Sequence, residues 1–275
     1  MFHFLPGACC NLNSLQICSI LLQVATLGIG LGLWIRVAAD WRKGHPLFPG
    51  SPPTSKTNST VDLVGFIIGF LILPGIVREL IGDDPQRRIA GYQIRSVIFC
   101  LFVLVWASIR LAPPFRQLPE ELQTLPRTAP IRRVWLGMWG FAIAYLPVSL
   151  LLLAVSPFRT AHPLIELFLK NPTPEMWRTL LFSAIVVAPL FEEFLFRVLL
   201  LNSLRQLLDP FRAILISSAI FAMIHGLVDA IPLYPLALVL GFLYYRTGSY
   251  LSVVTMHAMF NAYNLLQFRL SGIPS

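Results

Sequence analysis

Apolar residues gather along this chain in long runs separated by short polar stretches. A hydrocarbon core about 30 Å thick needs about 20 residues of helix, and eight runs approach that length. They cover residues 14–35, 61–77, 94–111, 134–156, 178–202, 212–229, 232–246 and 249–268. The pattern therefore predicts an all-α, polytopic membrane protein of about eight transmembrane helices, folded as a single integral membrane domain over residues 1–275.

Three features of this pattern lead to narrower expectations. No positively charged segment precedes the first run, so we expect a retained helix and not a cleaved signal. The seventh run is short and contains Pro232 and Pro235, which predicts an interrupted helix. Residues 161–170 place apolar side chains on one helical face, as in a short helix lying at the membrane surface.

Composition and charge agree with a membrane protein. Hydrophobic residues make up 56% of the 275 residues and charged residues 12%, against about 45–50% and 25% in soluble domains. The net charge of +8 comes from Lys and Arg that lie mostly between the runs, where the positive-inside rule accounts for them. We therefore expect a multi-pass protein of the cell membrane that contacts the lipid bilayer and no nucleic acid. A small excess of cations in the odd-numbered loops places those loops in the cytoplasm and both termini outside.

The fifth run contains three charges within A-P-L-F-E-E-F-L-F-R-V-L-L-L, residues 188–201. Each such charge costs about 2.5–3.5 kcal/mol at the centre of a spanning helix, so partners are needed. Glu193 and Arg197 are four residues apart and can pair along one helical face. Glu192 points about 100° away from Glu193, so it must face protein or water.

Two further runs carry polar side chains spaced by one helical turn. The sixth contains F-A-M-I-H, which ends at His225 and begins at Phe221, and the eighth contains H-A-M-F-N, with His257 and Asn261 at its ends. A lone histidine in an apolar helix is usually a packing residue. Asp229, four residues after His225, either orients that ring or is an ordinary acid at the end of the run.

Depth in the membrane gives an independent test of whether these groups belong together. Counted from the same side at about 1.5 Å per residue, Glu192, His225 and the pair His257 and Asn261 all lie roughly 12–20 Å deep. Unrelated polar residues need not share a depth. We therefore expect one water-accessible cavity between the fifth, sixth and eighth spans.

The residue types in this cavity suit hydrolysis of an acyl bond. A carboxylate beside an imidazole can position a water and remove its proton, which points to Glu192 with His225. His257 and Asn261 can donate hydrogen bonds to an oxyanion. We expect no cofactor, although side-chain types alone leave open a zinc ion bound by Glu192, His225 and His257 with an open position for water.

A function from another class also stays open at this point. Buried Glu and His side chains serve as proton relays in membrane proteins, so the same residues would suit a small transporter, or an immunity or scaffold protein without catalytic activity. Many transporter folds contain repeated halves, and the sequence shows no internal repeat. Hydrolysis is therefore the preferred interpretation.

Three of these runs contain short motifs: E-E-F-L-F-R (192–197), F-A-M-I-H (221–225) and H-A-M-F-N (257–261). The motifs resemble E-E-x-x-x-R, F-x-x-x-H and H-x-x-x-N/B of the CAAX-protease and bacteriocin-processing (CPBP) intramembrane endopeptidases. Their order and placement on separate runs agree as well. The resemblance covers about residues 178–268, the expected catalytic core. It implies an all-helical fold of about eight spans and cleavage of a peptide bond within the membrane.

By position, the resemblance implies that Glu192 is the general base, that His225 helps it to hold water, and that His257 and Asn261 stabilise the oxyanion. The other motif residues would support them: Glu193, Arg197 and Phe221. The family has been described both as metal-dependent and as glutamate-dependent. Its members act on prenylated CAAX tails or are linked to bacteriocin maturation and self-immunity, so we expect a membrane-associated or lipidated peptide or protein as the substrate.

Overall fold

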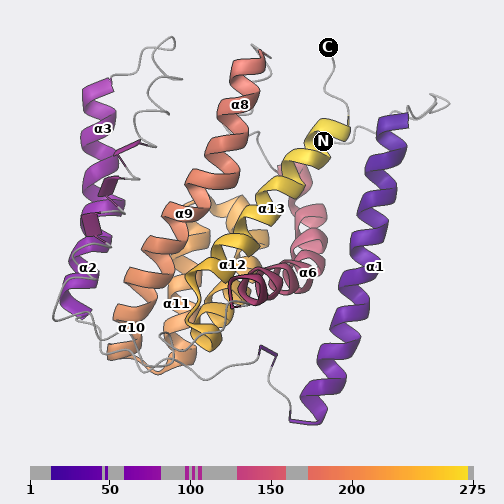
Figure 1. The fold of residues 1–275 in the computed structure, drawn as a ribbon, viewed down its shortest axis with the longest axis horizontal. Helices are drawn as coiled ribbons and strands as arrows, with labels where there is room; N and C mark the ends of the chain where they lie inside the picture. The colour runs from indigo at the N-terminus through magenta and orange to yellow at the C-terminus, as the bar shows by residue number, and fades with distance from the viewer. Residues whose placement is uncertain are drawn as a thin grey trace.

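The computed structural model describes residues 14–44, 47–48, 59–81, 97–98, 101–102, 105–106, 129–158 and 173–271. Within these ranges the regular elements are all helical, as predicted (Figure 1). The part before residue 159 contains α1 (Ser14–Arg42), α2 (Ser59–Ile67), the π-helix η1 (Ile68–Ile72), α3 (Leu73–Ile81), α6 (Ala129–Val155) and the 3₁₀ turn η2 (Ser156–Phe158).

The second half holds the site. The fifth apolar run lies within five helical segments that follow one another without a break. They are α8 (Pro174–Phe182), the π-helix η3 (Ser183–Val187), α9 (Ala188–Glu193), the π-helix η4 (Phe194–Leu201) and α10 (Asn202–Leu207). They are followed by α11 (Pro210–Met223), α12 (Leu227–Thr247) and α13 (Tyr250–Leu270).

Three helices of the described part are long and apolar enough to cross a membrane: Ser14–Arg42, Pro130–Val155 and Leu227–Thr247. Two shorter apolar helices are Thr60–Ile76 and Pro210–Met223. These helices indicate an integral membrane protein. The count of eight spans stays a prediction, because only scattered helical residues of the run 94–111 are described and the proposed surface helix at 161–170 lies outside the described residues.

Two predictions about the apolar runs were wrong: the interruption of the seventh run and the end of the sixth. The seventh run is not interrupted: α12 is one helix of 21 residues with Pro232 and Pro235 inside it, because packing against neighbouring helices supports a proline within a membrane helix. The sixth run ends earlier than expected, since α11 stops at Met223. Gly226 follows with φ +95°, a conformation that glycine adopts without steric cost, so His225 lies in a turn and not deep within a helix.

The core forms where α6 packs against α12 and α13, and where α11 packs against α12. Helix α6 approaches α13 closely because Gly137 has no side chain: a Cβ there would lie 2.5 Å from the Ser252 carbonyl oxygen. Small residues allow this kind of close packing between helices in lipid. The arrangement holds α13, which carries His257, at a defined height beside the fifth run.

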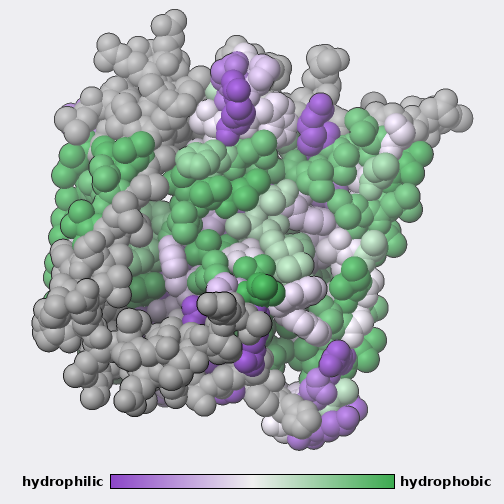
Figure 2. Space-filling view, viewed as in Figure 1, coloured by the Kyte–Doolittle hydropathy of each residue, from purple (hydrophilic) through white to green (hydrophobic). Residues whose placement is uncertain are grey.

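The remaining described helices lie at the edges of this core. In Figure 1, α1 and the pair α2–α3 lie at opposite edges, with α8 to α13 between them. Helix α1 joins α6 through the Trp34 indole, which donates to the Ile143 carbonyl at 2.9 Å. Apolar side chains on α1 are largely exposed, including Leu21, Val24 and Ile35. Figure 2 shows apolar residues over the middle of this face and hydrophilic ones gathered at its ends, as expected of a surface in contact with lipid.

The contact between α6 and α13 can be tested by adding one methyl group. We expect Gly137→Ala to lower the free energy of unfolding by about 1–3 kcal/mol, because the new Cβ overlaps the backbone of α13. Gly28→Ala is the matched control, since a Cβ at Gly28 meets nothing within 4 Å in the described structure. Denaturant unfolding in mixed micelles gives both values, and equal stability of the two variants would contradict this packing.

Candidate active site

A buried ion pair lies at the centre of the site. Arg197 donates from Nε to Glu193 Oε2 at 2.9 Å, and both side chains are 0% exposed. The pair spans the junction of α9 with η4, as expected from the spacing of four residues. The Arg197 guanidinium also lies over the Phe221 ring, with Cζ 5.1 Å from the ring centroid. This arrangement confirms that Glu193 and Arg197 pair with each other.

The second oxygen of Glu193 holds a histidine from α13. Glu193 Oε1 lies 2.8 Å from His257 Nδ1. A carboxylate oxygen accepts, so Nδ1 carries the proton in this contact. The opposite ring atom, Nε2, therefore faces away from Glu193, and it lies 3.8 Å from Glu192 Oε2. One buried carboxylate thus fixes the orientation of the His257 ring.

His225 is oriented by a backbone group. Its Nδ1 lies 2.8 Å from the Phe221 carbonyl oxygen, which can only accept, so this nitrogen is the donor. The carbonyl of Phe221 thus orients this ring, and the role suggested for Asp229 stays a prediction. The His225 Nε2 lies 3.8 Å from Glu192 Oε2, and the Phe221 ring packs 5.0 Å from the His225 ring and 5.8 Å from the His257 ring, between centroids.

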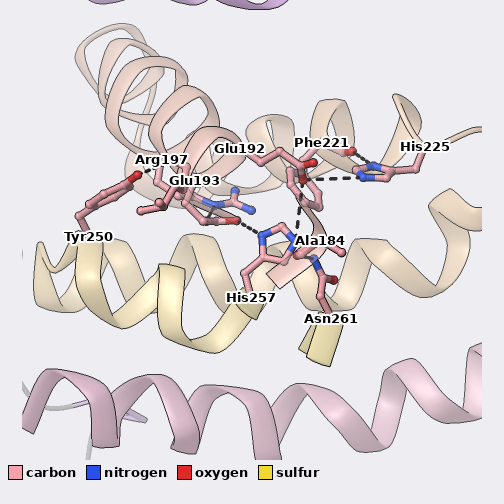
Figure 3. Close-up of polar contacts among 10 residues, drawn as sticks. Ala184, Glu192, Glu193, Arg197, Phe221, His225, Tyr250, His257 and Asn261 are labelled. Atoms are coloured by element: carbon pink, nitrogen blue, oxygen red, sulfur yellow. Dashed lines mark hydrogen bonds and ion pairs between the residues drawn. The ribbon is translucent and has the colours of Figure 1, made fainter. Parts of the chain in front are cut away.

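Glu192 is where these contacts converge. Two imidazoles, one from the turn after α11 and one from α13, present Nε2 to the same carboxylate oxygen (Figure 3). At 3.8 Å both separations exceed a direct hydrogen bond. The Glu192 side chain is 23% exposed, in contrast to 0% for Glu193. The two adjacent carboxylates therefore differ in surroundings. Glu193 is fully buried and each of its oxygens accepts a hydrogen bond, whereas Glu192 is partly exposed and faces two imidazoles.

Asn261 lies one turn beyond His257 on α13, and its amide nitrogen donates to the Ala184 carbonyl oxygen at 2.8 Å. The sequence predicted a donor to an oxyanion at this position. One hydrogen of the Asn261 amide thus bonds to the backbone of η3. The second hydrogen of this amide makes no hydrogen bond within the described residues.

Tyr250 is a residue near the site that sequence reasoning missed. Its hydroxyl donates to the carbonyl oxygen of Leu190, two residues before Glu192. The signal was present, because Tyr250 is seven residues before His257 and so lies on the same face of α13. A polar side chain at that spacing in an apolar run indicates a contact on the same side as the histidine.

No group of three or more His, Cys, Asp or Glu in the described part of the chain is arranged to hold a metal ion. Glu192, His225 and His257 are the residues that the zinc alternative would use. They do not form such a group as they stand, and the zinc alternative stays a hypothesis.

The buried ion pair makes a testable contribution to stability. We expect Arg197→Ala to lower the free energy of unfolding by about 3–5 kcal/mol, because it leaves Glu193 charged and buried without its cation. The pair of Arg212 with Asp209 provides a control, since its side chains are 74% and 50% exposed. Arg212→Ala should change stability little. Similar losses in both variants, measured by unfolding in micelles, would argue against a special role for the buried pair.

Comparison with known proteins now adds to this geometry. Residues 174–263 match the family described as type II CAAX prenyl endopeptidase Rce1-like. No curated protein matches the chain, and no solved structure does. The matched region begins with α8 and extends into α13, so it includes each residue of the site described above. It indicates a hydrolase of the CAAX protease type, and it supports membership of the chain in the CPBP family of intramembrane endopeptidases.

Proposed function

We propose that this protein is a multi-pass intramembrane endopeptidase of the cell membrane, which hydrolyses a peptide bond in a membrane-associated or lipidated substrate. The observation that carries the proposal is the approach of two imidazole Nε2 atoms to one oxygen of Glu192, at 3.8 Å each. That oxygen is buried and has no hydrogen-bond partner among the described residues. The family match over the same residues supports the reaction class.

Glu192 acts as the general base in this proposal. A separation of 3.8 Å is too long for a direct hydrogen bond. In this proposal a water beside the two groups bonds to both of them. Because His225 donates from Nδ1 to Phe221, the neutral ring offers a lone pair at Nε2, which accepts one water hydrogen. Glu192 takes the other proton as the water oxygen attacks the scissile carbonyl carbon. The carbon–nitrogen bond then breaks, and Glu192 returns that proton to the leaving amine.

His257 and Asn261 stabilise the oxyanion of the tetrahedral intermediate. His257 donates from Nε2 when its ring is protonated on both nitrogens, and the Glu193 carboxylate at Nδ1 stabilises that imidazolium. Asn261 contributes the amide hydrogen that Ala184 does not use. Losing one such donor typically costs about 2.7–4 kcal/mol in the transition state.

A lipidated substrate fits the surroundings of the site. Large apolar side chains on the segments that carry the site are exposed, among them Phe182 at the end of α8, and Met223 and Leu227 on either side of His225. In a bilayer these side chains contact acyl chains, so a lipid group on the substrate can approach along them. The family description names CAAX prenyl endopeptidases, and a farnesylated peptide is therefore the first substrate to test.

Replacing the general base is the direct test of the proposal. We expect Glu192→Gln to lower cleavage of a farnesylated CAAX peptide in proteoliposomes by about 10²–10⁴-fold, because the amide cannot take a proton from water. The unfolding transition should stay close to that of the wild type. Glu175→Gln is the matched control, since Glu175 is 71% exposed and its partner among the described residues is the exposed Arg178. Undiminished cleavage by Glu192→Gln would refute the assignment, and an unchanged biological effect without cleavage would favour a scaffold.

Metal removal tests the zinc alternative separately. In the proposed mechanism the carboxylate activates water, so we expect a strong zinc chelator to leave the cleavage rate unchanged after dialysis. The measurement is peptide cleavage by the purified wild type with and without chelator. Loss of activity that added Zn²⁺ restores would instead assign the water to a metal held by Glu192, His225 and His257.

A further inference from the structure

The helix that carries Glu192 has a carbonyl that its own backbone leaves unpaired. In the π-helix η3 the Ala188 N–H bonds to the Ser183 carbonyl, five residues back. The Ala184 carbonyl could otherwise accept from residue 188, as in an α-helix, or from residue 189, as in a π-helix. The first donor is already engaged, and Pro189 has no N–H. A backbone carbonyl in this position needs another donor, because leaving it unpaired within the membrane is costly.

Helix α13 supplies that donor and a second one nearby. Asn261 donates to the Ala184 carbonyl at 2.8 Å, and Tyr250 donates to the Leu190 carbonyl. His257 lies between them in sequence and binds Glu193 at 2.8 Å. The spacings of seven and four residues place all three side chains on one face of α13, and Figure 3 shows them directed at the helix that bears the two glutamates.

These three contacts restrict how the glutamate helix can move. Rotation by one residue turns a helix by about 100° and shifts it by about 1.5 Å along its axis. Either change would carry Glu192 away from the two imidazoles. Bonds at Ala184, Leu190 and Glu193 oppose both the rotation and the shift, since they fix the segment at three heights against one partner helix.

We infer that Tyr250 is a positioning residue for this hydrolysis. Tyr250 bonds to the Leu190 carbonyl, and Asn261 bonds to the Ala184 carbonyl, to which Pro189 cannot donate. These two contacts, here called the clamp, hold Glu192 opposite His225 and His257. The inference rests on the proposed function for its catalytic meaning. The hydrogen bond from Asn261 to the Ala184 carbonyl has a second effect. It fixes the orientation of the amide group, and with it the direction of the second amide hydrogen, which the proposed mechanism assigns to the oxyanion.

The Tyr250 half of the clamp is tested by kinetics. Tyr250→Phe keeps the ring, which packs 6.4 Å from the Phe194 ring between centroids, and removes only the hydroxyl. We expect kcat for the farnesylated peptide to fall about three- to tenfold, the equivalent of one hydrogen bond, with KM unchanged. Tyr263→Phe on the same helix is the matched control, since its hydroxyl bonds to Tyr145 and Gln267 and not to the glutamate helix, and it should keep the wild-type kcat. An unchanged kcat in Tyr250→Phe, or an equal fall in both variants, would overturn the role of Tyr250.

The Asn261 half is tested by stability, independently of activity. Pro189→Ala restores an N–H that can reach the Ala184 carbonyl, so Asn261→Ala should lower the unfolding temperature less in the Pro189→Ala background than in the wild type. Additive effects of the two substitutions would overturn this half. If the wild type fails to cleave the peptide while the two effects are non-additive, the proposed function and the catalytic meaning of the clamp are refuted together, and the contact remains as a structural one.

Discussion

The structure depends on one buried carboxylate, that of Glu193. A charge in a region without water is tolerated only when other groups compensate it, and Glu193 is compensated by Arg197 on its own helix and by His257 on α13. The first contact follows from helix geometry, but the second requires two distant segments to meet. Bonding to Glu193 therefore brings α13 against the fifth apolar run and orients the His257 ring in the same step.

Glu192 and Glu193 are identical side chains in different surroundings, and the proposed mechanism gives them different roles for that reason. Glu193 is sealed and its oxygens are used by an arginine and a histidine. Glu192 is partly exposed and faces two Nε2 atoms at 3.8 Å each, too far for direct hydrogen bonds. Environment, and not residue type, separates carboxylates into structural and reactive ones. Here the separation arises because neighbouring residues on a helix point in different directions.

Two π-helical segments, η3 and η4, flank the six residues of α9 that end with both glutamates. A π-turn changes which backbone groups pair, and such turns are frequent at functional sites. In η3 the change coincides with Pro189, and together they free a carbonyl that a side chain of α13 can bind. The irregular backbone thus gives the partner helix polar points of attachment in a region where apolar packing alone specifies register weakly.

The sequence by itself determined the features that depend on local geometry. The all-helical fold follows from long apolar runs, and the pair of Glu193 with Arg197 follows from a spacing of four residues, because both are set within a single helix. The tertiary structure decided which groups meet across helices. It placed His225 in a turn at Gly226, bound Asn261 to the Ala184 carbonyl and directed Tyr250 at Leu190. These contacts depend on how each helix is rotated and how closely it packs against its neighbours, and no spacing within one run contains that information.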